Sequence, residues 1–443
     1  MDASSPRAAN PSFAEATRTF ARIGLLSFGG PAGQIALMHK ILVDEKRWLD
    51  EARFLHALNY CMLLPGPEAM QLATYAGWLM HGTRGGLVAG LLFVLPGAAI
   101  ITVLSVLYLL FGGLPLVDGL LFGLRAAVLA IVVEALVRVS TRALRDWAAI
   151  WIAVAAFVAI AFLKLPFPVI ILAAALIGAA LHLASPKIGA GGADEKPETV
   201  DMPAWTQPSW SRFFSTLSVW LVIWFLPLAA LHWAWGSGSV YAVEAGFFSK
   251  MAVVTFGGAY AVLAYVAQQA VDIHGWLKPD EMLTGLGLAE TTPGPLILVL
   301  AFVGFLGGAR LSGLDPVTGG LVGATVALWF TFVPCFLWIF VGAPYVETVR
   351  NIRFLASALA AVTAAVVGII ANLTVWFGLH VLFGSVREWQ IGIFSLPVPD
   401  PASLDFAAAA IAVAAGMALI RYKVNMIAVI AVSALAGAAW ALV

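Results

Sequence analysis

Nine long apolar runs decide what this chain can fold into. Each is close to the roughly 20 residues that an α-helix needs to cross the hydrocarbon core of a bilayer. A soluble domain cannot bury so many runs of this length, whereas a bilayer accepts them as helices. The runs cover residues 85–111, 116–137, 147–163, 168–184, 213–235, 317–341, 352–377, 404–420 and 424–442.

The composition agrees with a membrane protein and excludes several other classes. Of the 443 residues, 62% are hydrophobic and 11% are charged, whereas soluble domains carry about 25% charged residues. The 24 Lys and Arg balance 24 Asp and Glu, so no basic excess is available to bind nucleic acid. Cys61 and Cys335 lie far apart in apolar runs. We expect them to pack as small hydrophobic residues, without a disulfide or a thiolate metal site.

Four further apolar stretches, 20–43, 52–80, 246–271 and 281–307, contain Gly or Pro near their middle. Because Pro lacks an amide donor and Gly is flexible, these stretches are predicted to be broken or re-entrant helices. Together with the nine runs they give about 13 membrane segments. The sequence therefore predicts an all-α polytopic membrane protein. The N-terminal tail, 1–19, lacks the apolar core of a signal peptide, so we expect no processing.

An internal repeat relates two parts of the chain. At one fixed offset, 20–67 aligns with 248–295 without a gap, and 14 of 48 positions are identical. The matches include Phe-Gly-Gly at 28–30 and 256–258 and Pro-Gly-Pro at 65–67 and 293–295. A cation precedes each Phe-Gly-Gly by six positions, Arg22 in one copy and Lys250 in the other. The two copies are predicted to be homologous units.

The repeat suggests an organisation in two halves. The expected parts are an N-terminal tail (1–19), a first repeat (20–184), a linker loop (185–212), a connecting transmembrane helix (213–235) and a second repeat (246–443). Because one unmatched helix separates two halves of six segments, the second half is predicted to be inverted in the membrane.

Loop charges favour the inverted arrangement. In the first half, basic residues gather between the fourth and fifth segments, whereas in the second half they gather in the loops on either side of that position. The positive-inside bias therefore reverses between the halves. The residues concerned are Arg138, Arg142 and Arg145, and then Arg350, Arg353, Arg421 and Lys423. The charged loop at 40–53 does not fit this scheme, and its side of the membrane is left open.

The two Pro-Gly-Pro sequences are the strongest pointers to a transport site. Open backbone at membrane depth survives only where protein or a water-filled cavity satisfies it, and matched interruptions in two halves are typical of transporter binding sites. Half-helix N-termini at the breaks would direct amides toward an anion. The alternative is that the glycines only allow close helix packing, which explains Phe-Gly-Gly better than Pro-Gly-Pro.

A charged side chain inside the membrane needs an interaction partner or a function. Arg22 and Lys250 recur by the repeat, which indicates a cation pair for the substrate, with snorkelling to the interface as the alternative. Glu68 follows the first Pro-Gly-Pro and Glu290 precedes the second, so either carboxylate could carry a coupling proton. The alternative is that each carboxylate only stabilises the terminus of a helix. The seven histidines show no metal-binding spacing, so no metal or cofactor is expected.

These motifs resemble the chromate ion transporter family, in its long two-domain form. The resemblance rests on FGGP and FGGA (28–31 and 256–259), Trp-Leu at 48 and 276, LPGP and TPGP (64–67 and 292–295), and the Gly-Gly pairs at 85 and 319. It covers nearly the whole chain. The second copy departs from the pattern with Ala259 in place of Pro31.

The resemblance implies a bacterial inner-membrane protein that exports chromate, confers chromate resistance and is coupled to protons, with sulfate as a similar oxyanion. A homodimer is compatible with this expectation. Residues expected to form the anion site are Arg22, Phe28, Gly29, Gly30, Pro31, Pro65, Gly66, Pro67, Lys250, Phe256, Gly257, Gly258, Pro293, Gly294 and Pro295. Other interpretations are a sulfate or other oxyanion transporter, an anion channel, and an intramembrane enzyme acting on lipid, for which no clustered acid–base or nucleophile arrangement appears.

Overall fold

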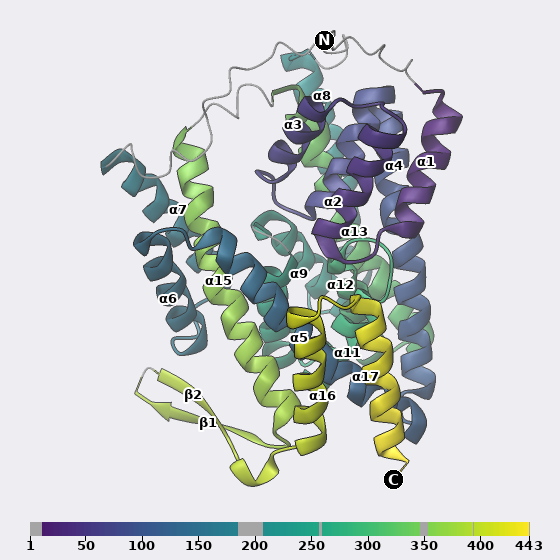
Figure 1. Ribbon diagram of the computed structural model, residues 1–443. Helices are drawn as coiled ribbons and strands as arrows, with labels where there is room; N and C mark the ends of the chain where they lie inside the picture. The colour runs from purple at the N-terminus through teal and green to yellow at the C-terminus, as the bar shows by residue number, and fades with distance from the viewer. Residues whose placement is uncertain (1–10, 185–206, 257–258, 346–352, 393, 443) are drawn as a thin grey trace.

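The structure is a computed structural model that describes residues 11–184, 207–256, 259–345, 353–392 and 394–442. The described chain is a bundle of helices with one small β-hairpin (Figure 1). Five described helices are long and apolar enough to cross a membrane. They are α4 (Glu68–Phe111), α5 (Pro115–Ala143), α8 (Trp210–Trp235), α13 (Pro316–Gly342) and α15 (Arg353–Leu382). The segment α4 consists of two helices joined by a kink at His81 and Gly82, whose backbone angles are not helical.

The other helices are shorter, and several are strongly apolar. They are α1 (Phe13–Leu26), α2 (Gly30–His39), α3 (Glu51–Cys61), α6 (Trp147–Ala161), α7 (Phe167–Ala184), α9 (Val240–Val254), α10 (Ala259–Ala267), α11 (Pro279–Glu290), α12 (Val299–Leu311), α16 (Phe406–Gly416) and α17 (Met426–Ala441). The predicted all-α polytopic architecture is confirmed at this level. The figure of about 13 membrane segments stays a prediction, and most of the linker lies outside the described residues.

Each of the four predicted interruptions falls between two helices. They separate α1 from α2, α3 from α4, α9 from α10 and α11 from α12. In the first break, Gly29 and Gly30 have φ angles of +87° and +70°, a left-handed conformation that favours glycine. Gly66 and Gly294, at the centres of the Pro-Gly-Pro sequences, also have positive φ, at +125° and +97°. Gly257 and Gly258 lie outside the described residues.

Matching π-helices follow the Phe-Gly-Gly breaks. They are η1 (Lys40–Glu45) and η3 (Gln268–Ile273), which the repeat aligns residue for residue. Each is followed by a residue with positive φ, Arg47 at +54° and Gly275 at +60°. The repeat is therefore visible in local backbone geometry as well as in residue identity.

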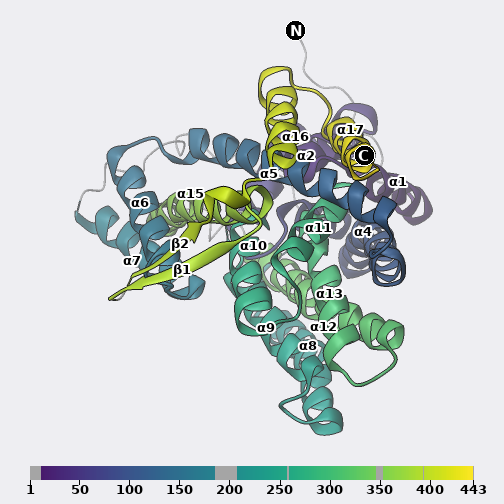
Figure 2. The ribbon, with the colours of Figure 1, turned by 90° about the horizontal axis from the view of Figure 1, so that it is seen from below.

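Helices of the two parts of the chain pack across one another. The pair α6 and α7 lies along α15, while α16 and α17 lie along α5 (Figures 1 and 2). Small residues allow the second contact to be close, since a Cβ on Gly123 would lie 1.9 Å from the Ser433 carbonyl oxygen. Each half therefore completes its packing with the last two helices of the other.

The β-hairpin was not predicted from the sequence. Strands β1 (Val386–Ile391) and β2 (Phe394–Pro399) pair antiparallel between α15 and α16, and Gly392 turns the chain with a φ of +62°. The Ser395 amide donates to the Phe162 carbonyl at 3.0 Å, which attaches the hairpin to the end of α6. Two short strands within a loop give a weak sequence signal beside apolar runs that are long enough to cross a membrane.

Candidate functional site at the crossing of the four breaks

Two backbone hydrogen bonds join the breaks reciprocally. The Gly66 amide donates to the Thr255 carbonyl at 2.9 Å, and the Gly294 amide donates to the Ser27 carbonyl at 2.8 Å. The repeat aligns the two donors with each other and the two acceptors with each other, so each bond is the counterpart of the other. Each Pro-Gly-Pro is therefore held by the residue that precedes the other copy's Phe-Gly-Gly. We call this region the crossing.

Matched hydroxyl groups support the two acceptor carbonyls. Ser27 Oγ donates to the Ile23 carbonyl at 2.6 Å, and Thr255 Oγ1 donates to the Met251 carbonyl at 2.5 Å. Each hydroxyl group thus donates to a carbonyl in the last turn of its helix. That carbonyl has no backbone amide of the helix left to accept from. These two bonds help to fix the points at which α1 and α9 end.

Two buried glutamines hold the Pro-Gly-Pro segments. Gln34 Nε2 donates to the Gly294 carbonyl at 2.6 Å, and Gln71 Nε2 donates to the Pro65 carbonyl at 2.8 Å. Both residues are buried, and among the described residues neither Oε1 has a hydrogen-bond partner. The sequence analysis missed them. The available signal was a glutamine side chain at an apolar stretch close to an interruption in each case.

The long helices α4 and α13 contact the Pro-Gly-Pro of the opposite half. A Cβ on Gly97, which follows Pro96 in α4, would lie 1.9 Å from the Pro293 carbonyl oxygen. Cys335 follows Pro334 in α13, and its Sγ would lie 2.9 Å from a Cβ on Gly66. Both cysteines are buried and unpaired, as predicted. Any side chain at Gly66 would be strained and crowded.

The described helices that begin at the breaks lack side-chain caps. Helix α2 begins after Gly29, α4 after Pro67, and the short 3₁₀ helix η4 (Leu296–Leu298) before α12 begins after Pro295, without a capping bond. Seven other described helices are capped by Ser12, Asp50, Asp146, Ser239, Asp315, Asp405 and Asn425, while α5 and α8 also begin without a side-chain cap. Uncapped first turns carry amides without helical partners and the positive end of the dipole.

The amides at the crossing are not all free. The prolines have no amide hydrogen, and the Gly66 and Gly294 amides are bonded, so the Pro-Gly-Pro segments themselves offer no free donor in this conformation. The donors instead come from the helix starts that follow. Around Gly29 and Gly30 a Cβ would meet no atom within 4 Å, so this side of the crossing is open.

The two recurring cations both lie at the surface of the described structure. Arg22 is exposed on α1 and pairs with Glu45 at 3.4 Å, and Lys250 is exposed on α9. Phe28, Pro31, Pro65, Pro67 and Phe256 are half-buried, whereas Pro293 and Pro295 are buried, and all of them lie at the breaks where the sequence placed them.

The two predicted carboxylates have different surroundings. Glu290 is buried at the end of α11 and accepts a 2.5 Å hydrogen bond from the Tyr260 hydroxyl on α10. This bond connects the two breaks of the second half. Glu134 and Arg138, which form an ion pair at 3.6 Å on α5, interact electrostatically with it. Glu68 is half-buried and is the first residue of α4.

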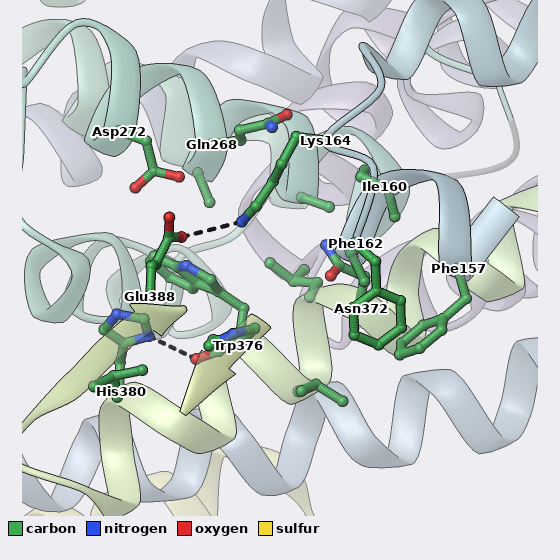
Figure 3. Close-up of a pocket in the computed structure, with 17 residues that line it drawn as sticks. Phe157, Ile160, Phe162, Lys164, Gln268, Asp272, Asn372, Trp376, His380 and Glu388 are labelled. Atoms are coloured by element: carbon green, nitrogen blue, oxygen red, sulfur yellow. Dashed lines mark hydrogen bonds and ion pairs between the residues drawn. The ribbon is translucent and has the colours of Figure 1, made fainter. Parts of the chain in front are cut away.

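A separate polar cavity of about 310 Å³ lies near the hairpin (Figure 3). Lys164 pairs with Glu388 of β1 at 3.2 Å, and Asp272 of η3 and His380 of α15 line the same cavity. Two carboxylates and one cation already in an ion pair do not suit a dianion. The cavity therefore lies apart from the crossing in both place and charge.

Comparisons with known proteins identify the relatives of the chain. The profile described as "Chromate transporter" matches residues 14–179 and 245–438. The chain is 32% identical over 363 residues to a chromate transport protein of Pseudomonas aeruginosa, covering 80% of this chain and 79% of that protein. It is 27% identical over 416 residues to a probable chromate transport protein of Synechococcus elongatus, covering 90% and 95%. No solved structure matches.

Replacement of Gln34 by Leu should weaken the crossing. The substitution removes the donor to the buried Gly294 carbonyl while keeping similar volume, and an unsatisfied buried acceptor costs about 1–3 kcal/mol. Thermal unfolding of the purified protein in detergent should show a lower midpoint for Gln34→Leu than for Gln390→Leu, a control on the exposed hairpin. Equal midpoints would contradict a stabilising role for Gln34.

Proposed function

Because the chain belongs to the chromate transporter family, we propose that it is a secondary transporter that exports chromate across the bacterial inner membrane in exchange for protons. The family match covers most of the chain, and the chain covers about four-fifths of the Pseudomonas relative. Chromate is a tetrahedral dianion, and sulfate has the same shape and charge. Both are therefore candidate substrates for the site. We favour chromate because the similar proteins are named chromate transport proteins.

We place the anion at the crossing. The observation that carries this proposal is that uncapped helix starts occur at breaks which reciprocal hydrogen bonds draw together. Helix N-termini bind anions through their free amides and dipoles without a net charge on the protein. The open space beside Gly29 and Gly30 supports access at the start of α2. Arg22 and Lys250 remain candidates for attracting the anion rather than for holding it.

We propose that the two halves are inverted repeats and that their rearrangement at the crossing alternates access. In Figure 1, α1, α2 and α3 lie in the upper part of the molecule, whereas α11 and α12 lie lower in the view. Equivalent broken segments that approach one centre from opposite faces are what an inverted repeat requires. The reversal of loop charge gives independent support.

We propose Glu290 as a proton carrier beside the site. Its carboxylate lies one turn before the second Pro-Gly-Pro, and its bond to Tyr260 connects two segments that would move relative to one another. Gain or loss of a proton on Glu290 changes that bond, because a protonated carboxyl can donate as well as accept. Glu68, at the start of α4, is the corresponding candidate in the first half.

Flux measurements in proteoliposomes test the function. The purified chain alone should move chromate, sulfate should compete with it, and an imposed pH gradient should accelerate chromate movement at constant membrane potential. Varying the potential at constant pH then separates coupled transport from a channel. Chromate movement that follows the potential and ignores the pH gradient would contradict proton exchange, and no chromate movement would contradict the substrate.

A pair of substitutions at one position tests the amide site. Glu68→Pro removes the first amide of α4 at a helix position that accepts proline, whereas Glu68→Gln keeps the amide and removes only the charge. A hydrogen bond to a charged ligand contributes about 1.5–3 kcal/mol, so Glu68→Pro should raise the KM for chromate about tenfold or more. Glu68→Gln should not raise it when flux is measured without a pH gradient. Equal KM values for the two variants would contradict the amide site.

A further inference from the structure

Glu244 is a buried carboxylate that the proposed site does not use. It lies in the second turn of α9 and is 0% exposed. Neither carboxylate oxygen has a hydrogen-bond partner among the described residues. The sequence analysis did not single it out, because it lies just before the aligned part of the repeat.

The space around the carboxylate is formed by two neighbouring residues. A Cβ on Gly307 of α12 would lie 2.5 Å from Glu244 Oε1 and 3.1 Å from the Trp276 ring. Gly307 therefore leaves room for the carboxylate, and the buried Trp276 ring lies beside it. Neither Gly307 nor Trp276 carries a charge that could offset a carboxylate.

Nearby charged and titratable groups are engaged elsewhere or lie at the surface. The groups on the packed elements are Tyr241 and Lys250 on α9, Arg212 and His232 on α8, Arg310 on α12, Cys335 on α13, Asp315 before α13, and His274 beside Trp276. The Tyr241 hydroxyl donates to the Gly319 carbonyl at 3.1 Å. Arg310 makes two hydrogen bonds to Glu281, at 2.6 and 2.7 Å. An unpaired buried charge is far costlier than a neutral carboxyl, so the neutral form fits this site.

The fold does not require a carboxylate here. When the offset of the repeat is extended to the start of α9, the position of Glu244 corresponds to Ala16 on α1, which is also buried. The first copy thus fills the equivalent position with a methyl group. A carboxyl at 244 adds a proton-binding group where packing alone needs none.

We propose that Glu244 binds a proton as a neutral carboxyl in this conformation and exchanges it with water during transport, which rests on the proposed function. Residues 236–238, which connect α8 to α9, are exposed, so an exposed connection lies within about two helical turns of Glu244 along the chain. Separation of α9 from α12 would open that path. The carboxyl group then releases its proton to water and becomes a carboxylate. It takes up a proton again before the helices close.

Infrared spectroscopy tests the proton without any transport. The spectrum of the wild-type protein minus that of Glu244→Gln should contain the carbonyl stretch of a protonated carboxyl group at neutral pH. As a matched control, Glu15→Gln removes an exposed carboxylate on α1 that pairs with Lys46, and its difference spectrum should contain carboxylate bands instead. Carboxylate bands in the Glu244→Gln difference would overturn the proposal. If Glu244→Gln does not fold, Glu244→Ala, which matches Ala16, replaces it.

Chromate flux tests the exchange. In proteoliposomes Glu244→Gln should lose the acceleration by a pH gradient, a loss of about fivefold or more, while flux at equal pH persists and Glu15→Gln behaves as wild type. Full acceleration in Glu244→Gln would overturn a role in exchange. A wild-type protein that shows the carboxyl band but moves no chromate would contradict the proposed function and leave the proton site established, so the two failures are distinguishable.

Discussion

The structure depends on hydrogen bonds for the backbone groups that the helix breaks leave without helical partners inside the membrane. Four breaks leave carbonyls and amides without helical partners, and hydrocarbon offers none. The reciprocal bonds from Gly66 to Thr255 and from Gly294 to Ser27 pair these groups across the two halves. Neither half can satisfy its own breaks in this way, so the halves are interdependent at their centre as well as through the exchanged helices that pack along α5 and α15.

The same constraint underlies the proposed anion site at the crossing. The Gly66 and Gly294 amides are paired, whereas the helix starts of α2, α4 and η4 at the described breaks have no side-chain cap. Bonds between the halves are also breakable by small movements, because each is a single backbone hydrogen bond between two separate segments. A substrate that accepts from neighbouring amides can therefore favour one arrangement of the halves over another.

Much of this organisation was predictable from the sequence. The fixed offset of the repeat located all four breaks, because the Gly and Pro residues that interrupt these stretches recur at matching positions of the two copies. The pairing of Ser27 with Gly294 was not predictable, since it joins segments from opposite halves of the chain. Gln34 was missed because the repeat matches it with Val262, and Glu244 was missed because it lies just before the aligned part of the repeat, so neither gives a recurring polar signal. The recurrence of Arg22 and Lys250 was real, but periodicity alone did not show that both are exposed.

The location of bound chromate tests the central claim most directly. Chromium scatters X-rays anomalously, so crystals of the protein with chromate would reveal its position independently of the refined chain. The account predicts an anomalous peak at the crossing, within hydrogen-bond distance of the first amides of α2 or α4. A peak in the cavity between Lys164 and Asp272, with none at the crossing, would contradict it.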